Sequence, residues 1–495
     1  MTLHKPVLPS EYAINPLPDV DIDGIIAPIV RESGESPVLK TAPARQLLER
    51  LPQQLPARGV PLADVVAEID TVVTQHSRRN AHPGFFGYIA GPGLPTDPLA
   101  HALVAALNQN VIGYPGAPGA TAVERTVVGW LRQLSGLPEA ADGVVVSGGS
   151  VANLSALAVA LYSTIGSEYI ASGAASCAGH RPVIIASKMV HFSVQRASVV
   201  LGLGVDHVIA VDHDEQFRMR PDSLELILDQ CAERHQQPVC VVASAGSTLT
   251  GSIDPLEAIG GICKNRGLWF HVDAAYGGAA MLSAALRPKF RGIEMADSLC
   301  MDLHKWFYIG FDGSLLLFRD PGEARNVFYT RSDYVRFPKD GTSEEHMFFH
   351  FSPELSRRFR ALPAYLGFRY YGSELLGRNV LHNHECAAYL AALVQEAPDM
   401  ELICEPDLSI CCFRYNPPEL KTDADQVDWI NSGIRNELQG EGDFFLSETM
   451  VEDRPVLRTC IVSHTTRAHH IEQLVKSIRR IGSSLLTSRD PATRD

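Results

Sequence analysis

The sequence predicts an α/β protein built on a mostly parallel sheet. From about residue 143 onward, short runs of apolar and β-branched residues alternate with amphipathic segments of helix length. Strands and helices that alternate in this way need crossover connections, which give parallel strands covered on both faces. The composition, 45% hydrophobic and 20% charged, is that of a folded chain, and no apolar run is long enough to span a bilayer. Disordered and membrane-spanning classes are therefore excluded.

The N-terminal part, residues 1–90, is predicted to be a helical extension. Residues 44–51 and 62–74 place apolar residues three and four positions apart, which is the period of an amphipathic helix. Several prolines precede these two segments. We expect this extension to pack on something larger.

The central part, residues 91–372, is predicted to be the large domain. Its predicted strands lie at residues 144–146, 182–186, 207–211, 239–243, 268–272 and 314–318. Its predicted helices lie at residues 150–163, after His191, and at 222–234 and 255–265. In open α/β sheets, ligands bind beyond the carboxyl ends of the strands, so functional residues are expected there.

The C-terminal part, residues 373–495, is predicted to be a smaller α+β domain. Its predicted elements are a helix at 375–396, strands at 409–415 and 456–462, and a last helix at 471–485. Before it, residues 326–351 are polar and irregular, which predicts a long loop.

Charge and cysteine usage narrow the class further. The chain has 43 Lys+Arg against 57 Asp+Glu, a net charge of −14, which disfavours binding to nucleic acid or to an anionic membrane. The ten cysteines contain no CxxC pair with zinc spacing, and the N-terminus shows no secretory signal pattern. We expect reduced thiols and a cytoplasmic location.

A serine- and glycine-rich segment, residues 147–153, lies between a predicted strand and a predicted helix. Glycines let the backbone approach an anion, and a helix N-terminus offers free N–H groups and a favourable dipole. The segment is equally compatible with a plain helix start in which Ser150 is the N-cap. It lacks the Rossmann and Walker A spacings, which disfavours a dinucleotide or ATP.

Asp273 ends the predicted strand at 268–272. A carboxylate at the tip of a buried strand needs a cationic or hydrogen-bonding partner, so the alternatives are a structural ion pair and a functional group. Active sites of open α/β sheets collect at such tips, which favours function.

Lys305 stands among aromatic residues, and the chain has only nine lysines. It is followed by Trp306, Phe307 and Tyr308, so we expect it to be partly desolvated, whereas an ordinary lysine is solvated. Desolvation lowers the pKa of an amine and makes it a nucleophile toward carbonyl groups. An anion-binding turn, a strand-tip Asp and a buried Lys are together what pyridoxal phosphate requires.

Four segments, at residues 146–153, 191–194, 271–276 and 298–306, resemble the pyridoxal-phosphate-dependent group II amino-acid decarboxylases, which include the aromatic-L-amino-acid decarboxylases. The similarity runs from about His82 to the end of the chain. It implies an aspartate-aminotransferase-like fold (PLP fold type I) with a seven-stranded, mostly parallel sheet. It also implies a homodimer with active sites at the subunit interface, on which the N-terminal extension packs.

The resemblance also implies roles for particular residues. Lys305 resembles the Schiff-base lysine, Asp273 the partner of the pyridine nitrogen, and Ala275 the small residue beneath the ring. Gly149 and Ser150 resemble the phosphate-binding turn, and His304 lies near that phosphate. His191 resembles the histidine that stacks on the cofactor, and Thr248 and Asp254 occupy family-like positions. Asp254 also fits a helix N-cap, with Pro255 at N1 and Glu257 at N3.

Tyr334 resembles the tyrosine of the family's catalytic loop. Loss of CO₂ leaves a carbanion that must be protonated at Cα, and a phenol on a closing loop can do this. Relatives that lack this tyrosine tend toward oxidative deamination to an aldehyde, so Tyr334 favours simple decarboxylation.

The substrate side chain is expected to contact Tyr88, Ile89 and Tyr114. Ile89 and Gly91 replace an aromatic and a hydroxyl-bearing residue, which either enlarges the pocket or reshapes it around a small substrate. No basic residue stands in these segments, so an aromatic or other hydrophobic amino acid is favoured over an acidic one. Asp302 stands where Asn is more frequent, with no consequence evident from the sequence.

Other functions remain open at this stage. They are decarboxylation of a small aliphatic or non-standard amino acid, aldehyde synthesis, transamination or desulfuration on the same fold, and a non-catalytic scaffold. A metal hydrolase would rest on His464, His469 and His470, which are more simply surface residues. We expect no metal, no nucleic acid and no membrane partner.

Overall fold

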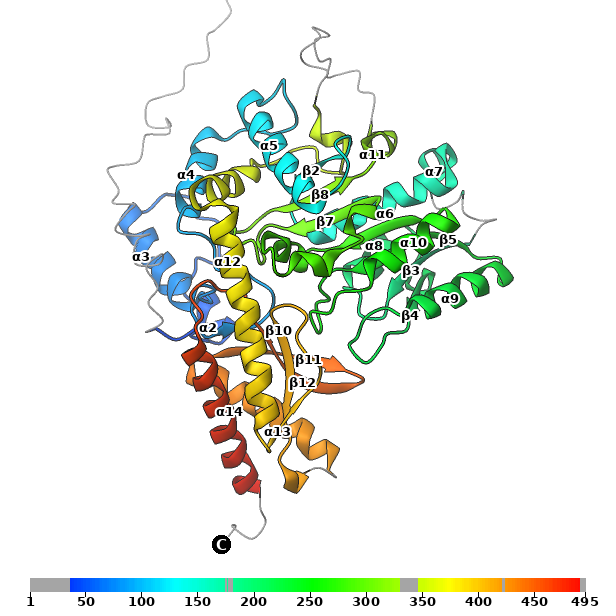
Figure 1. Cartoon of the computed structure of the whole chain (residues 1–495). Coiled ribbons are helices and arrows are strands. Elements are labelled where there is room, and N and C mark those ends of the chain that lie inside the picture. The colour runs from blue at the N-terminus through cyan, green and yellow to red at the C-terminus, as the bar shows by residue number, and fades with distance from the viewer. Residues whose placement is uncertain (1–35, 174–175, 177–180, 330–345, 421–422, 490–495) are drawn as a thin grey trace, which may run out of the picture.

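The computed structural model describes residues 36–173, 176, 181–329, 346–420 and 423–489. Its centre is a seven-stranded sheet in the order β2-β8-β7-β6-β5-β3-β4 (Figure 1). Neighbouring strands from β7 to β4 run parallel, and β8 alone is antiparallel to its neighbours β7 and β2. The strands are β2 (Asp142–Val146), β3 (Pro182–Ser187), β4 (Val208–Val211), β5 (Gln237–Ser244), β6 (Trp269–Asp273), β7 (Ser298–Asp302) and β8 (Ser314–Phe318). The predicted mostly parallel, seven-stranded sheet is confirmed.

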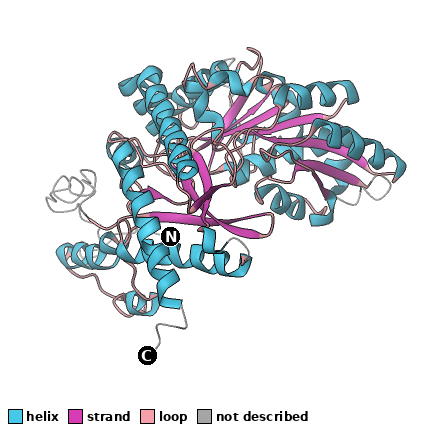
Figure 2. Cartoon of the chain, turned by 60° about the horizontal axis from the view of Figure 1, so that its bottom comes forward, coloured by secondary structure: helices cyan, strands magenta, loops and turns pink. Residues whose placement is uncertain are grey.

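Helices cover both faces of this sheet (Figure 2). The helix α6 (Gly149–Ile165) is buried over most of its length because residues 156–161 are all apolar and face strands or other helices. The other helices of this part are α4 (Asp97–Leu107), α5 (Pro118–Ser135), α7 (Ser167–Ser172), α8 (Ser193–Val200), α9 (Pro221–Glu233), α10 (Leu256–Arg266) and α11 (Pro321–Phe328). The sequence did not predict α4, α5, α7 or α11, and residues 326–328 of α11 fall in the segment predicted to be a loop.

The C-terminal part contains a five-stranded sheet in the order β1-β11-β12-β10-β9. Its strands are β1 (Phe85–Phe86), β9 (Met400–Leu402), β10 (Ile410–Tyr415), β11 (Phe445–Val451) and β12 (Arg454–Cys460). The strand β1 comes from the N-terminal extension and pairs in parallel with β11, which ties the two ends of the chain together. The helices α13 (Ala424–Glu441) and α14 (Ala468–Arg489) pack against each other and on this part of the molecule.

The long helix α12 (Ala361–Glu396) connects the two sheets and runs down the length of the molecule (Figure 1). It packs on α4 and α5 at one end and on β10 and α14 at the other. Gly372 interrupts it with φ 74°, a left-handed conformation that glycine adopts without strain. The helix therefore begins before the interruption, earlier than the predicted start at residue 375.

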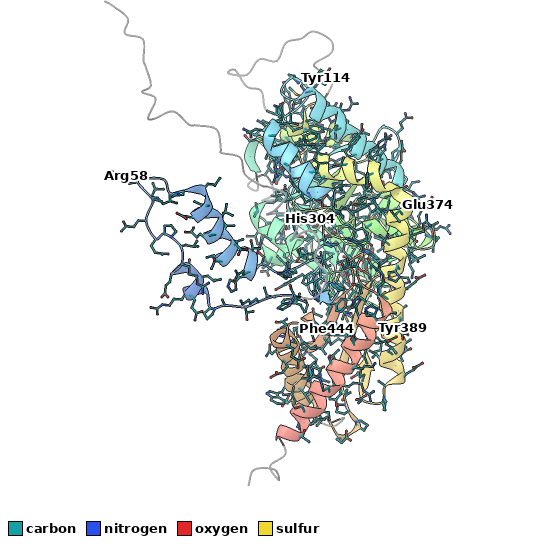
Figure 3. The ribbon with its side chains drawn as sticks, turned by 90° about the vertical axis from the view of Figure 1, so that its left-hand side faces the viewer. Arg58, Tyr114, His304, Glu374, Tyr389 and Phe444 are labelled. Carbon is teal, nitrogen blue, oxygen red and sulfur yellow. The ribbon has the colours of Figure 1, made fainter. Side chains whose placement is uncertain are left out.

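The helices α2 (Ala44–Leu48) and α3 (Leu62–Val72) stand away from the rest of the chain (Figure 3). Val72 is the one residue of these two helices that is buried. Apolar side chains between residues 48 and 73 are instead exposed: Leu48, Leu55, Val60, Ile69 and Val73. In the described part of the chain, no element covers these apolar side chains. Within the described ranges, no helix has both the length and the hydropathy to cross a membrane.

Candidate active site

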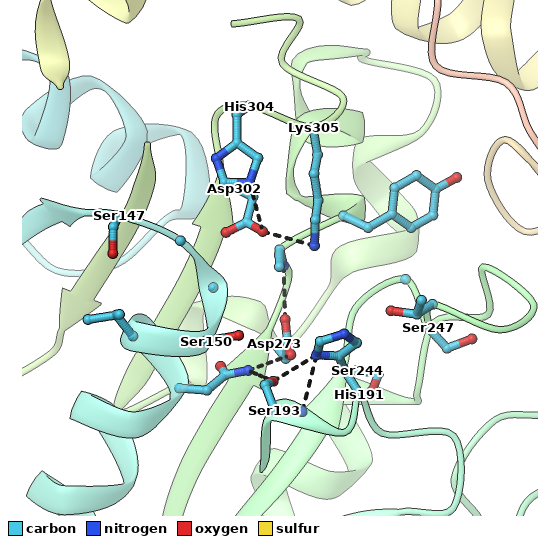
Figure 4. A pocket seen from close by; sticks show the side chains of 18 of the residues that line it. Ser147, Ser150, His191, Ser193, Ser244, Ser247, Asp273, Asp302, His304 and Lys305 are labelled. Atoms are coloured by element: carbon cyan, nitrogen blue, oxygen red, sulfur yellow. Dashed lines mark hydrogen bonds and ion pairs between the residues drawn. The ribbon is translucent and has the colours of Figure 1, made fainter. Parts of the chain in front are cut away.

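A cavity of about 440 Å³ opens where the central strands end. Ser244, Asp273 and Asp302, the last residues of β5, β6 and β7, all line it. Eight residues that the sequence singled out also line this one cavity: Gly149, Ser150, His191, Thr248, Asp273, Ala275, His304 and Lys305 (Figure 4). The expectation that chemistry lies at the carboxyl edge of the sheet therefore matches the geometry.

Lys305 lies just beyond β7 with its amine directed into the cavity (Figure 4). Its side chain is 19% exposed, and Trp306, Phe307 and Tyr308 beside it are fully buried. The Nζ atom lies 2.8 Å from Oδ2 of Asp302. Burial lowers the pKa of Lys305, but the Asp302 carboxylate outweighs it and holds the pKa above its ordinary value. Partial desolvation was correctly predicted, whereas the predicted lowering of the pKa is wrong because Asp302 was not taken into account.

Asp273 ends β6 and is held from several sides. Its Oδ2 accepts a hydrogen bond from Nδ2 of Asn153 at 2.9 Å, and its Oδ1 accepts from the backbone N–H of Ala275 at 3.1 Å. The Cys300 thiol also donates to Oδ1, at 3.3 Å. Burial raises the pKa of Asp273, but the charge of Lys305 and the Asn153 hydrogen bond outweigh it and keep the pKa below its usual range. Asp273 is thus a buried, ionised carboxylate.

Asn153 connects Asp273 to His191. Its Nδ2 also donates to Oγ of Ser193 at 2.8 Å, and that oxygen lies 2.8 Å from Nδ1 of His191. The backbone N–H of Ser193 donates to the same Nδ1, so this nitrogen is an acceptor and the neutral ring carries its proton on Nε2. Burial lowers the pKa of His191, which favours this neutral form.

The glycine-rich turn forms the start of α6. Gly148 is the N-cap residue and Ser150 makes no capping hydrogen bond, so the alternative in which Ser150 caps the helix is wrong. A Cβ atom at Gly149 would lie 3.0 Å from Oδ1 of Asp302 and 3.4 Å from Cβ of Ala275. The turn is therefore a close-fitting surface at a helix N-terminus, which suits an anionic group such as a phosphate.

His304 lines the cavity next to the turn. Its Nδ1 accepts a hydrogen bond from the backbone N–H of Gly313 at 3.1 Å, and its ring stacks on Phe311 with centroids 4.4 Å apart. Burial lowers the pKa of His304, although Asp302 opposes the shift. His304 is thus a neutral, oriented donor whose Nε2 lies on the Asp302 side.

These residues fit pyridoxal phosphate. The cavity offers a lysine amine, an ionised carboxylate on the next strand and a helix N-terminus shaped by glycine. The conserved-domain model of the pyridoxal-dependent decarboxylases matches residues 44–416.

The chain belongs to this family. An aromatic-L-amino-acid decarboxylase of Bacillus atrophaeus is 29% identical to it, over 91% of this chain and 92% of the relative. An aspartate 1-decarboxylase of Aliivibrio fischeri is 31% identical, over 84% and 82%. The solved structure of mouse CSAD in apo form has a TM-score of 0.87 at 25% identity and covers 93% of this chain and 97% of that one. The chain is therefore a pyridoxal-phosphate-dependent carboxy-lyase of fold type I.

The decarboxylase does not use Asp254 as a helix cap. The residue at the N-cap of α10 is Pro255, and no side chain caps it. The Asp254 carboxylate instead accepts hydrogen bonds from the backbone N–H groups of Met219 (2.6 Å) and Ser244 (2.7 Å). Burial raises its pKa to about 7, partly offset by these two bonds. The predicted capping box is wrong because two amides outside the helix bind the carboxylate.

The predicted substrate residues Tyr88, Ile89 and Tyr114 are not among the described residues that line the cavity. Tyr88 and Tyr114 are 55% and 43% exposed. Their contact with substrate stays a prediction. Tyr334 lies outside the described residues.

The structure explains why a glycine stands at position 91, which the sequence alone did not. Its N–H donates to the carbonyl oxygen of His304 at 3.2 Å, and a Cβ atom here would lie 2.2 Å from the carbonyl oxygen of Lys305. The missing side chain thus lets this segment approach the backbone of the lysine. Neither enlargement nor reshaping of the pocket is needed to explain this glycine.

Two residues were missed from the sequence. Asn153 was considered only as part of the turn, although its position on an otherwise apolar helix face indicates a buried polar role.

Arg458 of β12 is 4% exposed, and its Nε and Nη2 find no acceptor among the described residues. Its Nη1 donates to the carbonyl oxygen of Tyr88 at 3.3 Å. A buried guanidinium with free N–H groups needs an anion.

The histidines considered for a metal hydrolase form no such site in the described part of the chain, which contains no group of three His, Cys, Asp or Glu able to hold a metal ion. Burial lowers the pKa of His470 to about 4, with further lowering by His469, His82 and Arg467.

Proposed function

We propose that this decarboxylase converts an L-amino acid with an aromatic or other hydrophobic side chain to the corresponding amine and CO₂. The observation that carries the proposal is the single cavity that unites Lys305, Asp273 and His191. Among the described residues that line it, Lys305 alone carries a permanent positive charge. Among these described residues, a second, side-chain carboxylate on the substrate would therefore find no cation besides Lys305, which disfavours an acidic substrate despite the aspartate decarboxylase relative.

The roles of the residues follow from their chemistry. When bound, pyridoxal phosphate supplies an electron-accepting ring that takes up the electrons left at Cα as CO₂ departs. Lys305 would hold the cofactor, and the ionised Asp273 would hold a proton at its pyridine nitrogen. Gly149, Ser150 and His304 would bind its phosphate, and Thr248 and Ala275, which line the same cavity, would contact it.

His191 and Arg458 are proposed to position the substrate. His191 is oriented by Ser193, and its neutral ring would contact the cofactor without adding charge beside the departing carboxylate. Arg458 has unused N–H groups that suit the α-carboxylate. Tyr334 is proposed to return a proton to Cα, and that role rests on the resemblance of its loop.

We further propose a homodimer with active sites at the subunit interface, in which residues 1–90 pack on the partner, 91–372 bind the cofactor and 373–495 form the small domain. Support comes from exposed apolar side chains on the N-terminal arm and on α4, where Leu99, Leu103 and Leu107 repeat every four residues. Tyr88 and Tyr114 are exposed in one chain and would be covered in such a dimer.

A cytoplasmic location is also proposed. The nine described cysteines are all free thiols, which supports it.

The deciding experiment is a screen of the standard amino acids for release of CO₂ and amine by the holoenzyme. We expect the highest kcat/KM for aromatic or large aliphatic substrates, with no ammonia or peroxide. Lys305→Ala should abolish both turnover and the visible absorption of the bound cofactor, whereas Lys188→Ala, an exposed lysine paired with Asp212, should change neither. Turnover of aspartate or glutamate above all others would refute the substrate class, and full activity of Lys305→Ala would refute the site.

A further inference from the structure

Asp302 is a buried carboxylate in the cavity for which the proposed function has no use. It ends β7, is 2% exposed, and its Oδ2 lies 2.8 Å from Nζ of Lys305 (Figure 4). Its Oδ1 is buried and finds no hydrogen-bond donor among the described residues. A buried charge needs compensation, so Lys305 and Asp302 each stabilise the other's charged form.

No other group near Asp302 replaces Lys305 as its counter-charge. Nε2 of His304 lies 3.7 Å from Oδ2, but burial lowers the pKa of that histidine and favours its neutral form. The other titratable groups that interact with this pair are His191, also neutral, the thiols of Cys300 and Cys460, and the Asp273 carboxylate. Among the described groups around Asp302, the lysine ammonium is thus the main source of compensation.

We propose that Asp302 is a positioning residue that holds Lys305 in the cofactor-free enzyme and competes with pyridoxal phosphate for it. The proposal rests on the assignment of Lys305 as the cofactor lysine. The ion pair must separate before the amine can react, so it lowers the affinity for the cofactor. The fraction of enzyme with bound cofactor would then depend on the concentration of pyridoxal phosphate. At the same concentrations, an enzyme with a neutral residue at this position would be saturated.

The exchange balances without any further reactant. Lys305 gives one proton of its ammonium to Oδ2 of Asp302, and the freed amine attacks the aldehyde carbon. The carbon–nitrogen double bond forms as the aldehyde oxygen leaves as water with the two remaining amine hydrogens. The proton remains on Oδ2 of Asp302, so the ion pair of the cofactor-free enzyme does not re-form. Release of the cofactor is the reverse, with one water consumed.

A second effect of the same carboxylate must be separated from this one. Oδ1 lies 3.0 Å from the position of a Cβ at Gly149, so Asp302 also faces the phosphate-binding turn. A carboxylate there could weaken binding by repelling the phosphate without any action on the lysine. Pyridoxine 5′-phosphate separates the two effects, because it carries the phosphate but has no aldehyde with which to bond the lysine.

The test measures the Kd of both ligands for full-length enzyme freed of cofactor, by absorbance and fluorescence titration. In Asp302→Asn we expect the Kd for pyridoxal phosphate to fall about tenfold or more. This gain in affinity should be at least about five times the gain in affinity for pyridoxine 5′-phosphate. A smaller ratio of the two gains, or a loss of affinity for pyridoxal phosphate, overturns the proposal. Asp312→Asn is the matched control, because that carboxylate pairs with Arg360 at 3.0 Å near His304 and makes no described contact with Lys305.

Asp302→Ser keeps the proposal testable if the amide variant does not fold, since a small neutral residue also frees the lysine. The same gain ratio is expected for it. Failure of the proposed function would look different: wild-type enzyme and Lys305→Ala would then bind pyridoxal phosphate equally well, whatever the Asp302 variants do.

Discussion

At the scale of single residues, the site depends on side chains whose roles the motifs do not reveal. Asn153 is the clearest case, because one amide group binds both Asp273 and Ser193, which are 120 and 40 residues away in the chain. It fixes an ionised carboxylate and, through Ser193, the orientation of His191. Its effect on activity should therefore exceed that of an ordinary buried asparagine.

Asn153→Leu keeps the size of the side chain. It removes the bonds to Asp273 and Ser193 and also those that Oδ1 of Asn153 accepts from Nε2 of His271 (2.9 Å) and the Cys300 thiol (3.3 Å). A hydrogen bond to a charged group contributes about 1.5–3 kcal/mol, so we expect kcat to fall roughly 10- to 100-fold. Steady-state kinetics and the cofactor absorption spectrum measure the effect. The control is Asn431→Leu, a buried asparagine that binds the backbone of Tyr415, which should lower stability while leaving kcat of the folded enzyme unchanged. Equal kcat in Asn153→Leu and wild type would contradict the network.

Tyr334 can be tested through the product and not only through the rate. Tyr334→Phe removes the phenolic proton, so we expect the amine yield to fall and aldehyde, ammonia and peroxide to appear. Mass spectrometry of the products and a peroxide assay distinguish the outcomes. Tyr329→Phe, on an exposed tyrosine directly after α11, is the control and should leave the product unchanged. An intact amine yield in Tyr334→Phe would remove this residue from the mechanism.

The residues that could be predicted from the sequence are those whose chemistry is signalled by their neighbours. Lys305, Asp273 and the turn at Gly149 each stand in a local pattern, and the cavity unites all of them. The charge state of Lys305 could not be predicted, because it depends on the contact between its amine and Asp302 at the end of β7. The sequence contained Asp302, but the 2.8 Å contact is a property of the fold.

At the scale of elements, the segment before α4 that contains Gly91 packs against the backbone of Lys305. Gly91 accepts the close approach of the His304 and Lys305 backbone that any side chain would block. Gly91→Ala should therefore displace Lys305 and weaken cofactor binding about tenfold or more, since a Cβ contact of 2.2 Å cannot be kept. Cofactor titration and a crystal structure of the variant check this expectation.

Gly119→Ala is the control for that change. Gly119 lies in α5, and a Cβ atom there would meet only open space, so alanine should raise stability by about 0.5–1 kcal/mol and leave cofactor binding unchanged. If Gly91→Ala binds cofactor as wild type does, the glycine serves the substrate pocket, as the sequence first suggested.

The elements that could not be predicted lack the pattern that prediction relies on. The helix α5 places Glu124 on its buried face, where an apolar residue is expected, because Arg357 neutralises it from 233 positions away. Arg357 also donates to the carbonyl oxygens of Val111 (2.6 Å) and Val145 (2.7 Å), so the pair fastens α5 to β2. The Asp254 cap failed for the same reason, since long-range partners outcompeted the local ones. Strands and helices with regular apolar periods, such as β5 and α3, were predicted correctly.

At the scale of the whole molecule, the described residues expose apolar surface in two places, which the proposed dimer would cover. On α4, Leu99, Leu103 and Leu107 are 58%, 43% and 53% exposed and share one face of the helix. The N-terminal arm adds a second exposed apolar surface (Figure 3). Neither surface could be assigned a partner from periodicity alone, because an apolar stripe predicts burial and not what covers it.

Leu103→Asp tests the dimer directly. A charge at the centre of the α4 stripe would be desolvated in an interface, so we expect the variant to sediment as a monomer and to lose activity, because the proposed active sites need both subunits. Leu226→Asp on α9 is the matched control: it changes a 58% exposed leucine on another helix and should leave mass and activity unchanged. A dimeric, fully active Leu103→Asp would show that α4 lies outside the interface. A monomeric variant that keeps full activity would instead show that each chain carries a complete site.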